Sequence, residues 1–419
     1  MKTLVLGTGA REHALAWKLS QSADVKAVYL HPGNAGTQAV GLSGLDTGSD
    51  HPRDIIPLAK QLGIELIVIG PEIMLARGDA TEYRNAGFLV VGPDKSGAEL
   101  ESSKAFAKSF MKKENIPTAC YFEATSAEDF HSTWNKKLPV VLKLDGLAAG
   151  KGVVVAESVE DIDQFLDSIW KLGTFGPGPH RIIVEDFIQG NELSYIGLCD
   201  GETFLPLASS TDYKRIGENQ TGPNTGGMGA ISPSPYITDS LEATIEAEII
   251  RPILKTMKTE GMRFRGVLYI GLMITPYGAP YVLEFNTRFG DPETQAIMMR
   301  LENGFAQALR ATALGELRTV PTLKWTQHPA VYVVAAAEGY PSKATAGDTI
   351  TGWNHAHSPT IQVFFAGVNI VDNHMVTQGG RILGVGSVGP DIASARDAAY
   401  QHLNHIKWRG QQIRKDIGL

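Results

Sequence analysis

Residues 143–153 read Lys143-Leu144-Asp145-Gly146-Leu147-Ala148-Ala149-Gly150-Lys151-Gly152-Val153, a glycine-rich turn with a lysine near each end. This is not a Walker A motif, because one residue too few separates Gly146 from Gly150 and because Gly152 stands in place of Ser or Thr. A strand-like run, Val153-Val154-Val155, follows instead of a helix. We therefore predict a hairpin flap whose backbone N–H groups approach phosphate oxygens while its lysines offset their charge. The alternative is an ordinary glycine-rich hairpin turn with two solvated lysines.

Upstream of this loop, strand-like and helical segments alternate. The expected strands are Thr3–Leu6, Ala27–Leu30, Leu66–Ile69 and Phe88–Val91, and the expected helices are Glu12–Leu19 and Arg53–Leu62. This rhythm predicts a doubly wound parallel sheet for residues 1–102, with helices on both faces. The strands end in glycine-rich turns at residues 7–9, 32–36 and 70–72. Such turns gather at the carboxyl edge of an open α/β sheet, where ligands bind.

Beyond residue 102 the pattern becomes α+β. A helix is expected over residues 102–111, and strands Val140–Leu144, Val153–Ala156 and Ile182–Glu185 with helix Asp161–Leu172 predict a compact, antiparallel lobe. We assign residues 103–325 to one region, with this flap lobe inserted at about 124–189. Short strands separated by glycine turns then predict a β-rich domain at 326–419, closed by a helix near Ile392–Ile406.

Composition limits the classes of partner. The 419 residues carry a net charge of −7, which offers no cationic face for nucleic-acid phosphates. No apolar run reaches the length of about 18 residues that a membrane span needs, and the N-terminal run is too short for a signal peptide. The two cysteines, Cys120 and Cys199, lie far apart and lack zinc-site spacing. We expect a cytoplasmic, reduced protein that binds neither nucleic acid nor membrane, and its protein partners are unknown from the sequence.

Glu284 and Asn286 place a carboxylate and an amide two residues apart in a predicted strand. Alternation along Val282–Glu293 puts Glu284, Asn286 and Arg288 on one face. Hard oxygen ligands of this kind suit Mg²⁺, which shares its shell with phosphates and water. Arg288 is then placed to stabilise a transferred phosphoryl group. Asp291 has a competing interpretation, because Asp291-Pro292-Glu293 is also a good helix start with Asp as the N-cap.

Two further segments are candidates for ligand contacts. Val184–Ile188 followed by Gly190-Asn191-Glu192 fits an adenine hinge, although an acid-capped strand turning at glycine is a common structure. Ser210–Arg215 precedes the polar, glycine-rich Thr221–Ala230, which shows no helix or strand period. Long structureless loops in compact domains are usually functional. Asp212 with the neighbouring cations Lys214 and Arg215 could hold an amino acid by both ends, and the alternative is a solvated turn.

Several sequence motifs resemble those of the glycinamide ribonucleotide synthetases, a family of ATP-grasp enzymes. They are Arg11-Glu12-His13-Ala14, Pro32–Gly36, Ser103–Phe106, Asp145–Val153, Thr221–Ala230 and Arg288–Thr294. They occur in the family's order and spacing up to about residue 300, and the remainder resembles the family only in size and β-rich character. The resemblance implies an ATP-grasp fold and ATP-dependent ligation of glycine to 5-phosphoribosylamine through glycyl phosphate, in purine biosynthesis. It also implies a need for Mg²⁺, with Mn²⁺ as a possible substitute.

Residue roles follow from the same resemblance. It implies that ATP contacts the side chains of Lys104, Lys143 and Lys151, the backbone of Gly146, Gly150 and Gly152, and, at its adenosine, Glu185, Phe187, Ile188 and Glu192. Glu284 and Asn286 would hold the metal ion. Gly9, Arg11, Asn34 and Gly36 would lie near phosphoribosylamine, and Asp212, Lys214, Arg288 and Asp291 would surround glycine and the acyl phosphate. The chain departs from the family's usual residues at Ala10, Tyr213, Ile231 and Thr287.

Three other functions compete with this interpretation. Another ATP-grasp ligase of the purine pathway, acting on a different acid, would share most of the motifs. An NAD-dependent oxidoreductase is suggested by Gly7-Thr8-Gly9, but Glu12 occupies the third glycine position and no acid follows the second strand. A non-catalytic nucleotide-binding module would not need the set Glu284, Asn286 and Arg288.

Overall fold

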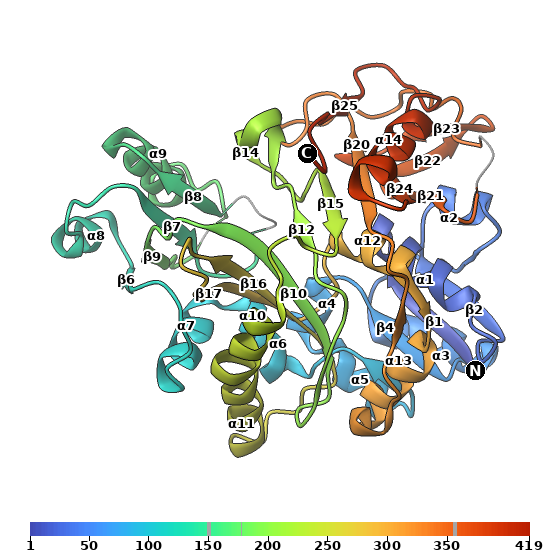
Figure 1. The fold of residues 1–419 in the computed structure, drawn as a ribbon, viewed down its shortest axis with the longest axis horizontal. Helices are drawn as coiled ribbons and strands as arrows, with labels where there is room; N and C mark the ends of the chain where they lie inside the picture. The colour runs from blue at the N-terminus through green and yellow to red at the C-terminus, as the bar shows by residue number, and fades with distance from the viewer. Residues whose placement is uncertain (149–151, 177, 355–357) are drawn as a thin grey trace.

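A computed structural model describes residues 1–148, 152–176, 178–354 and 358–419 (Figure 1). The chain begins with a five-stranded parallel sheet in the order β3-β2-β1-β4-β5. Its strands are β1 (Lys2–Gly7), β2 (Ala27–Pro32), β3 (Ser43–Gly44), β4 (Leu66–Ile69) and β5 (Leu89–Val91). The predicted parallel sheet is therefore confirmed, with the short β3 added at one edge.

Helices cover both faces of this sheet because its strands alternate their buried side chains. They are α1 (Ala10–Ser20), α2 (Ala35–Ala39), α3 (Pro52–Leu62), α4 (Glu72–Arg77), α5 (Asp79–Asn85) and α6 (Lys95–Ser102). Val5 packs with α1 on one face, whereas Leu4 and Leu6 pack with α3 and α5 on the other. The loops after β1, β2 and β4 end at the same sheet edge, as the sequence predicted.

The lobe at residues 121–186 is a separate four-stranded sheet in the order β6-β9-β7-β8, paired throughout in antiparallel fashion. It contains β6 (Tyr121–Ala124), α8 (Ala127–Thr133), β7 (Val140–Leu144), β8 (Val153–Ala156), α9 (Val159–Trp170) and β9 (Ile182–Asp186). Phe130 and Phe165 from its two helices pack on Leu142 of the sheet. The predicted compact lobe is confirmed, and β7 and β8 flank the glycine-rich loop.

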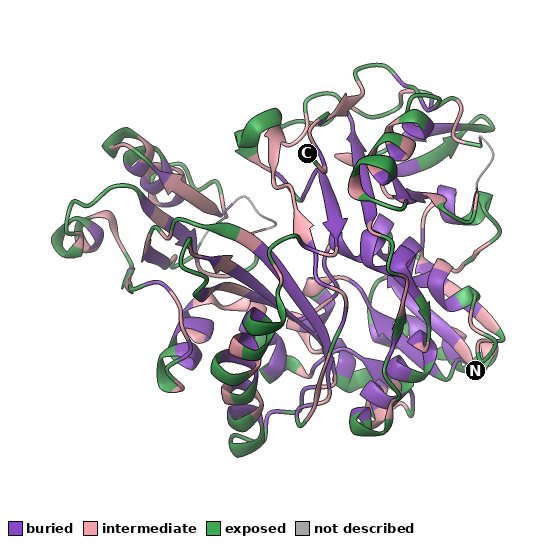
Figure 2. Cartoon of the chain, viewed as in Figure 1, coloured by how far each residue is buried: buried purple, intermediate pink, exposed green. Residues whose placement is uncertain are grey.

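A second four-stranded sheet, in the order β11-β10-β16-β17, occupies the middle of the molecule. Its strands and covering helices are β10 (Asn191–Cys199), β11 (Phe204–Pro206), β16 (Gly266–Ile274), β17 (Pro280–Asn286), α7 (Lys104–Lys113), α10 (Asp239–Ile245) and α11 (Arg251–Thr259). Helix α13 (Phe305–Leu314) packs between this sheet and the N-terminal one. Figure 2 shows β10 and β16 buried along most of their length.

The glycine-rich stretch Thr221–Ala230 is not structureless, and that expectation was wrong. Four short strands lie in it or just before it: β12 (Thr211–Asp212), β13 (Arg215–Gly217), β14 (Thr221–Asn224) and β15 (Gly229–Ser232). Strand β15 pairs with β20 (Ala330–Ala336), about a hundred residues later. Such pairing gives no local period, because it is set by a distant strand rather than by neighbours in sequence. Strands β12 and β15 thereby lie at one edge of the C-terminal sheet, whereas β13 and β14 pair with each other in a separate hairpin.

The C-terminal sheet has six strands: β12-β15-β20-β24-β21 in order, with β25 also pairing β20. The remaining elements are α12 (Glu293–Arg300), β18 (Leu301–Asn303), β19 (Lys324–Trp325), β21 (Ile361–Phe365), β22 (Val368–Val371), β23 (His374–Thr377), β24 (Arg381–Val388), α14 (Ile392–Leu403) and β25 (Gln412–Ile413). Helices α12 and α14 both pack against β20 and β24. The predicted β-rich character and closing helix are confirmed.

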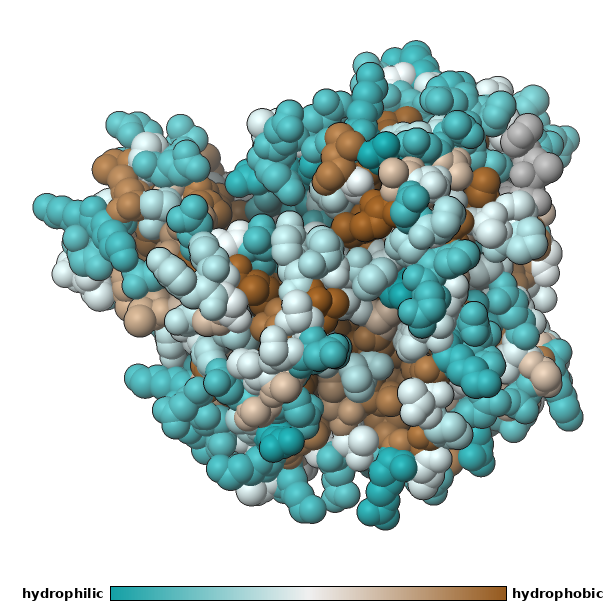
Figure 3. All heavy atoms as spheres, viewed as in Figure 1, coloured by the Kyte–Doolittle hydropathy of each residue, from teal (hydrophilic) through white to brown (hydrophobic). Residues whose placement is uncertain are grey.

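The outline of the molecule is indented between the lobe of α8 and α9 and the part that carries β14 (Figure 3). Within the described ranges, no helix is both long and apolar enough to span a membrane.

Candidate active site

The end of β17 carries the two candidate metal ligands. Glu284 lies opposite Gly271 of β16, and a Cβ added at Gly271 would be 3.2 Å from Cγ of Glu284. Asn286 is the last residue of the strand and is buried. Across the described ranges, the carboxylate of Glu284 has no hydrogen bond or ion pair. A carboxylate and an amide oxygen are thus available two residues apart, which fits a hard divalent cation such as Mg²⁺.

Positive charge surrounds Glu284. Burial raises the pKa of its carboxyl, but the charges of Lys214, Lys143, Lys104 and Arg288 outweigh burial and lower the pKa below its ordinary value. The carboxyl is consequently ionised at neutral pH, as a metal ligand must be. These four cations come from four separate stretches of sequence, and they meet around one acid.

Arg288 does not continue the strand face, because β17 ends at Asn286. The expected alternation through residue 288 was therefore wrong. The guanidinium nevertheless returns to the same place: Nη2 donates to Oδ1 of Asn286 at 3.2 Å. It also pairs with Glu101 at 3.0 Å and Glu72 at 3.3 Å, both from the N-terminal part of the chain. Neighbouring Thr287 donates its backbone N–H (2.8 Å) and hydroxyl (3.2 Å) to Glu101.

Two of the candidate ATP lysines sit at the base of the flap lobe. Lys104 begins α7 and donates to the carbonyl of Gly146 at 2.9 Å. Lys143 of β7 donates to the carbonyl of Leu283 at 2.9 Å and pairs with Glu185 of β9 at 2.9 Å. Burial lowers the pKa of Lys104. Both lysines therefore approach the Glu284 strand from the flap side.

The glycine-rich loop is anchored to the start of α7. Ser103 caps the helix by accepting from the N–H of Phe106, and its hydroxyl also donates to Asp145 at 3.2 Å. Gly146 has φ +102°, a conformation that favours glycine. A Cβ at Gly152 would be 2.7 Å from Cβ of Ala148. Gly150 and Lys151, two of the predicted phosphate contacts, lie outside the described residues.

The candidate adenine hinge connects β9 to β10. Phe187 is 41% exposed and Ile188 is half-buried. Glu192 is the second residue of β10, and its carboxylate is 2.5 Å from Nζ of Lys214. An exposed aromatic ring beside a chain turn is an available apolar cover for a flat ligand. The predicted hinge residues therefore lie in sequence order along one connection, next to Lys214.

Asp212 and Lys214, the candidate glycine contacts, lie close together. Nζ of Lys214 is 3.9 Å from Asp212, and both project from the segment that begins with β12. Burial is the main cause that raises the pKa of Asp212, to about 8; the charge of Lys214 opposes this rise, and the carboxylates of Glu293, Glu192 and Glu284 contribute to it. Burial lowers the pKa of Lys214, but Asp212 and Glu192 outweigh it and raise this pKa well above its ordinary value.

Asp291 is not the cap of α12. Helix α12 begins at Glu293, and residue 291 makes no cap hydrogen bond. Its carboxylate instead accepts from Nε2 of Gln295 at 2.8 Å and pairs with Arg381 at 2.8 Å. The helix-start interpretation was therefore wrong, because an arginine from β24 holds this carboxylate.

The four candidate residues for phosphoribosylamine cluster at the N-terminal sheet edge. A Cβ at Gly9 would be 3.7 Å from Oδ2 of Asp291, and Arg11 donates to the carbonyl of Phe289 at 3.1 Å. Asn34 caps α2 and donates to the carbonyls of Thr8 (2.7 Å) and Phe365 (3.0 Å). At Gly36, a Cβ would be 2.1 Å from Cγ of Phe365. Gly9 and Arg11 thus face the Asp291 region, whereas Asn34 and Gly36 contact the C-terminal sheet.

The departures from the family's usual residues have local explanations. Ala10 is the first residue of α1, where an alanine fits without strain. Tyr213 packs its ring 5.1 Å from the guanidinium of Arg414.

Sequence reasoning missed several residues that touch this site. Lys108 pairs with Glu185 at 3.2 Å and donates to the hydroxyl of Thr118 at 2.7 Å, and burial lowers its pKa to about 8. It lies one helical turn after Lys104, a spacing that the sequence displays. Arg381 had no such signal, because its partner Asp291 is ninety residues away. Tyr269 and Ser194 meet the buried Glu293 at 2.6 and 3.1 Å, again across separate strands.

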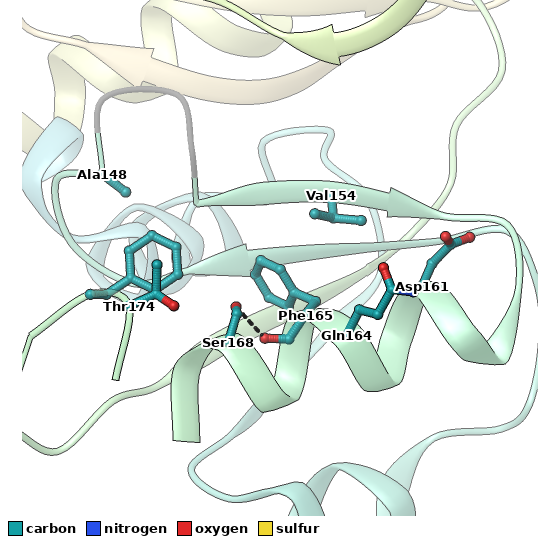
Figure 4. A pocket seen from close by; sticks show the side chains of 8 residues that line it. Ala148, Val154, Asp161, Gln164, Phe165, Ser168 and Thr174 are labelled. Atoms are coloured by element: carbon teal, nitrogen blue, oxygen red, sulfur yellow. Dashed lines mark hydrogen bonds between the residues drawn. The ribbon is translucent and has the colours of Figure 1, made fainter. Parts of the chain in front are cut away.

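A separate hollow of about 530 Å³ lies within the flap lobe (Figure 4). It is lined by side chains from β8, α9 and the loops beside them, among them Val154, Phe165 and Phe175. None of the candidate site residues described above lines it. Its closeness to Ala148 links it to the flap, but the polar groups that would act on a ligand lie elsewhere.

Family models match three consecutive parts of the chain. The model described as phosphoribosylglycinamide synthetase, N domain, matches residues 1–101; the ATP-grasp (A) domain of the same synthetase matches 102–294; and its C domain matches 330–419. The match of the C domain extends the similarity beyond residue 300, where the motifs alone showed only size and β-rich character.

Curated relatives and solved structures agree with these models. Phosphoribosylamine–glycine ligases from Neisseria meningitidis serogroup B and Vibrio cholerae are 44% and 41% identical over 420 residues, covering 100% of this chain and 98% of each relative. The crystal structure of the ligase from Thermotoga maritima has a TM-score of 0.86 and 34% identity, with complete coverage of both chains. A biotin carboxylase domain from Hydrogenobacter thermophilus, in complex with MgADP, shares the fold at TM-score 0.74 and 18% identity, covering 98% of this chain and 91% of that one. The chain is therefore a member of the phosphoribosylglycinamide synthetase family of ATP-grasp enzymes.

Proposed function

We propose that this protein ligates glycine to 5-phosphoribosylamine, with ATP, to give glycinamide ribonucleotide, ADP and phosphate in purine biosynthesis. The observation that carries the proposal is the ionised Glu284 with Lys104, Lys143, Lys214 and Arg288 gathered around it. Such an arrangement supplies charge stabilisation for phosphoryl transfer without any protein nucleophile. Full-length relatives named phosphoribosylamine–glycine ligase support the choice of substrates.

The reaction needs activation of glycine, because a carboxylate is a poor electrophile. A carboxylate oxygen of glycine attacks the γ-phosphorus of ATP, the bond to ADP breaks, and glycyl phosphate forms. The amine of phosphoribosylamine then attacks the carbonyl carbon, phosphate leaves, and the amine gives up a proton as the amide forms. The two steps together consume one ATP and join the two substrates, so that the enzyme's task is positioning and charge stabilisation.

On the ATP side we assign Lys104, Lys143 and Lys151 with the backbone at Gly146, Gly150 and Gly152 to the phosphates, and Glu185, Phe187, Ile188 and Glu192 to the adenosine. The ion pair of Glu185 with Lys143 supports this, because it fixes the lysine's ammonium group beside the Glu284 strand. Lys108 pairs with the same oxygen of this carboxylate, at 3.2 Å. The exposed ring of Phe187 is available to cover a purine.

Glu284 and Asn286 are our proposed ligands for Mg²⁺. When held by these residues, the metal ion would neutralise phosphate charge during phosphoryl transfer. The one carboxylate and one amide leave most of its coordination shell to phosphates and water, which is the usual arrangement for Mg²⁺ and also suits Mn²⁺.

We assign the glycine end to Asp212, Lys214, Arg288 and Asp291. An ionised Asp212 would accept from the ammonium group of glycine, and the cations would face its carboxylate. Arg288 is restrained by Glu101 and Glu72, which supports a fixed charge rather than a mobile one. Asp291 is similarly restrained by Arg381. Held charges need no reorganisation when the phosphoryl group is transferred.

Phosphoribosylamine would bind at the N-terminal sheet edge, near Gly9, Arg11, Asn34 and Gly36. The approach of Gly9 to Asp291 supports this, since it brings the sheet edge beside the proposed glycine end.

We propose domain boundaries of 1–102, 103–325 and 326–419, with the flap lobe at about 124–189. Both cysteines are free thiols, which supports a reducing cytoplasmic location.

The first test is ADP release with ATP, Mg²⁺, glycine and phosphoribosylamine generated in situ, omitting each component in turn. We expect turnover only with all four, together with the glycinamide product. ADP release that ignores glycine would keep the ATP-grasp chemistry but exclude glycine as the acid. Replacement of Mg²⁺ by Mn²⁺ in the same assay tests the choice of metal.

A further inference from the structure

Residues 412–418 run along the segment that carries Asp212 and Lys214. Strand β25 pairs with β20, and the residues after it turn toward the hairpin formed by β13 and β14. A Cβ at Gly229 of β15 would be 2.8 Å from Cγ2 of the buried Ile417. This 412–418 segment is therefore packed tightly against the strands at one border of the proposed glycine site.

An ion pair dominates the contact. Arg414 is only 1% exposed, and its Nε and Nη2 donate to the two carboxylate oxygens of Asp416 at 2.8 and 2.6 Å. Its third nitrogen, Nη1, donates to the carbonyl of Arg215 at 3.0 Å and to Oε1 of Gln220 at 3.3 Å. Oδ2 of Asp416 accepts from the backbone N–H of Asn219 at 2.8 Å. The pair thus bonds to both ends of the short turn after Lys214.

Tyr213 connects this pair to the site. Its ring lies 5.1 Å from the guanidinium carbon of Arg414, within cation–π range, and its hydroxyl accepts from the N–H of Gly418 at 3.0 Å. Its backbone N–H donates to the carbonyl of Gly229 at 3.0 Å, and its carbonyl accepts from the N–H of Met228 at 2.8 Å. In a segment of extended backbone, the side chains of adjacent residues point to opposite sides. Anchoring Tyr213 on one side therefore sets the direction of its two neighbours, Asp212 and Lys214, on the other.

We propose that Arg414 and Asp416 are positioning residues for glycine binding, acting through Tyr213 on Asp212 and Lys214. The proposal rests on the glycine-ligating function above. A buried ion pair is a weak source of net stability. This pair instead fastens two backbone groups around the glycine-binding segment, at Arg215 and Asn219, while the N–H of Gly418 is bonded to the Tyr213 hydroxyl. It contacts none of the residues assigned to phosphoribosylamine, which are held by Phe289 and Phe365.

Three substitutions of increasing severity test the proposal: Tyr213→Phe, Asp416→Asn and Arg414→Lys. Each is conservative in volume, and Tyr213→Phe keeps the ring while removing only the hydroxyl contact. We expect the KM for glycine to rise by about threefold for Tyr213→Phe and about tenfold for the other two, at saturating ATP and phosphoribosylamine. The KM for phosphoribosylamine should stay unchanged.

The matched control is Arg409→Ala. Arg409 lies a few residues earlier and also pairs with two carboxylates, Glu338 and Asp348 at 2.8 Å each, but it has no contact with the 213–220 segment within the described residues. It should lower thermal stability without changing the KM for glycine. Circular dichroism and thermal unfolding of every variant identify those that are folded at the assay temperature.

Two results would overturn the positioning role. One is an unchanged KM for glycine in all the folded variants, and the other is an equal rise in the KM values for both substrates, which a merely structural role predicts. The proposed function is judged separately on the wild-type protein: if its ADP release ignores glycine, the ligase assignment fails before any variant is compared.

Discussion

At the scale of single residues, the site depends on one acid, Glu284, that faces several cations. Replacing Glu284 by Gln keeps the shape but removes the negative charge that the metal ion requires. We expect kcat to fall by about a hundredfold or more, with a higher Mg²⁺ concentration needed for half-maximal rate. Initial rates across a Mg²⁺ titration check this.

The control for Glu284→Gln is Glu302→Gln, a change of the same chemistry at an exposed position on β18. It should leave both the rate and the Mg²⁺ dependence unchanged. If the Glu284→Gln variant keeps the Mg²⁺ dependence of the wild-type protein, Glu284 is not a metal ligand.

The second residue-scale prediction concerns pH. Burial raises the pKa of Asp212 from 3.8 to about 8. Only the ionised form accepts a bond from the glycine ammonium group, so the KM for glycine should fall as pH rises through about 8. In Asp212→Asn the KM should be high and should lose this step. Steady-state kinetics between pH 6 and about pH 9 in both proteins check the prediction.

The same shift has a consequence for stability with a definite sign. Between pH 3.8 and about 8 the folded protein holds the Asp212 proton more tightly than the unfolded chain does. The free energy of unfolding must therefore fall as pH rises through this window. Asp212→Asn should be less sensitive to pH than wild type in this range. Parallel pH profiles from chemical denaturation of the two proteins would argue against the shift.

At the scale of elements, two helices with the same type of cap allow a matched comparison. Ser103 caps α7 and Ser158 caps α9, each accepting a backbone N–H at 3.1 Å. Only Ser103 also bonds Asp145 at the start of the glycine-rich loop. Alanine at either site should cost about 1 kcal/mol of stability. Only Ser103→Ala should raise the KM for ATP, by a few fold.

Equal KM values for ATP in Ser103→Ala and Ser158→Ala would show that the link between cap and loop has no effect on nucleotide binding. Thermal unfolding of both variants verifies that the two caps were removed at similar cost.

At the scale of the whole molecule, Arg381 joins the C-terminal sheet to the site. From β24 it donates to the carbonyls of Gly226 (2.5 Å) and Asp291 (3.0 Å) and pairs with the Asp291 carboxylate. Arg381→Ala should lower the free energy of unfolding by about 2 kcal/mol, since it leaves polar groups without partners. It should also lower kcat/KM for glycine about tenfold or more.

Lysine at position 381 keeps the charge but lacks the planar fork, so it should recover only part of kcat/KM. Arg396→Ala, which breaks an exposed pair with Asp397, serves as the control and should leave kcat/KM unchanged. Full activity in Arg381→Ala would confine this residue to a structural role.

Local patterns were sufficient for some elements of the fold and insufficient for others. The strand at 66–69 and the strands that flank the glycine-rich loop agree with prediction, because their side chains alternate or form short apolar runs. The strands at 211–212 and 229–232 were missed, since these polar and glycine-rich segments become strands only through pairing with segments distant in sequence: β15 pairs with β20, and β12 pairs with β15. Asp291 was assigned an alternative cap role for the same reason: its partner Arg381 comes from another sheet.

The sequence by itself determined the fold class and the positions of the glycine-rich loop and of the acid–amide pair at 284 and 286, because each depends on the spacing of nearby residues. Only the tertiary structure decided which cations surround Glu284, that Glu72 and Glu101 restrain Arg288, and that Arg414 lies against Tyr213. These contacts join residues separated by tens to hundreds of positions along the chain. Packing of whole sheets against one another brings them together, and no local periodicity records that packing.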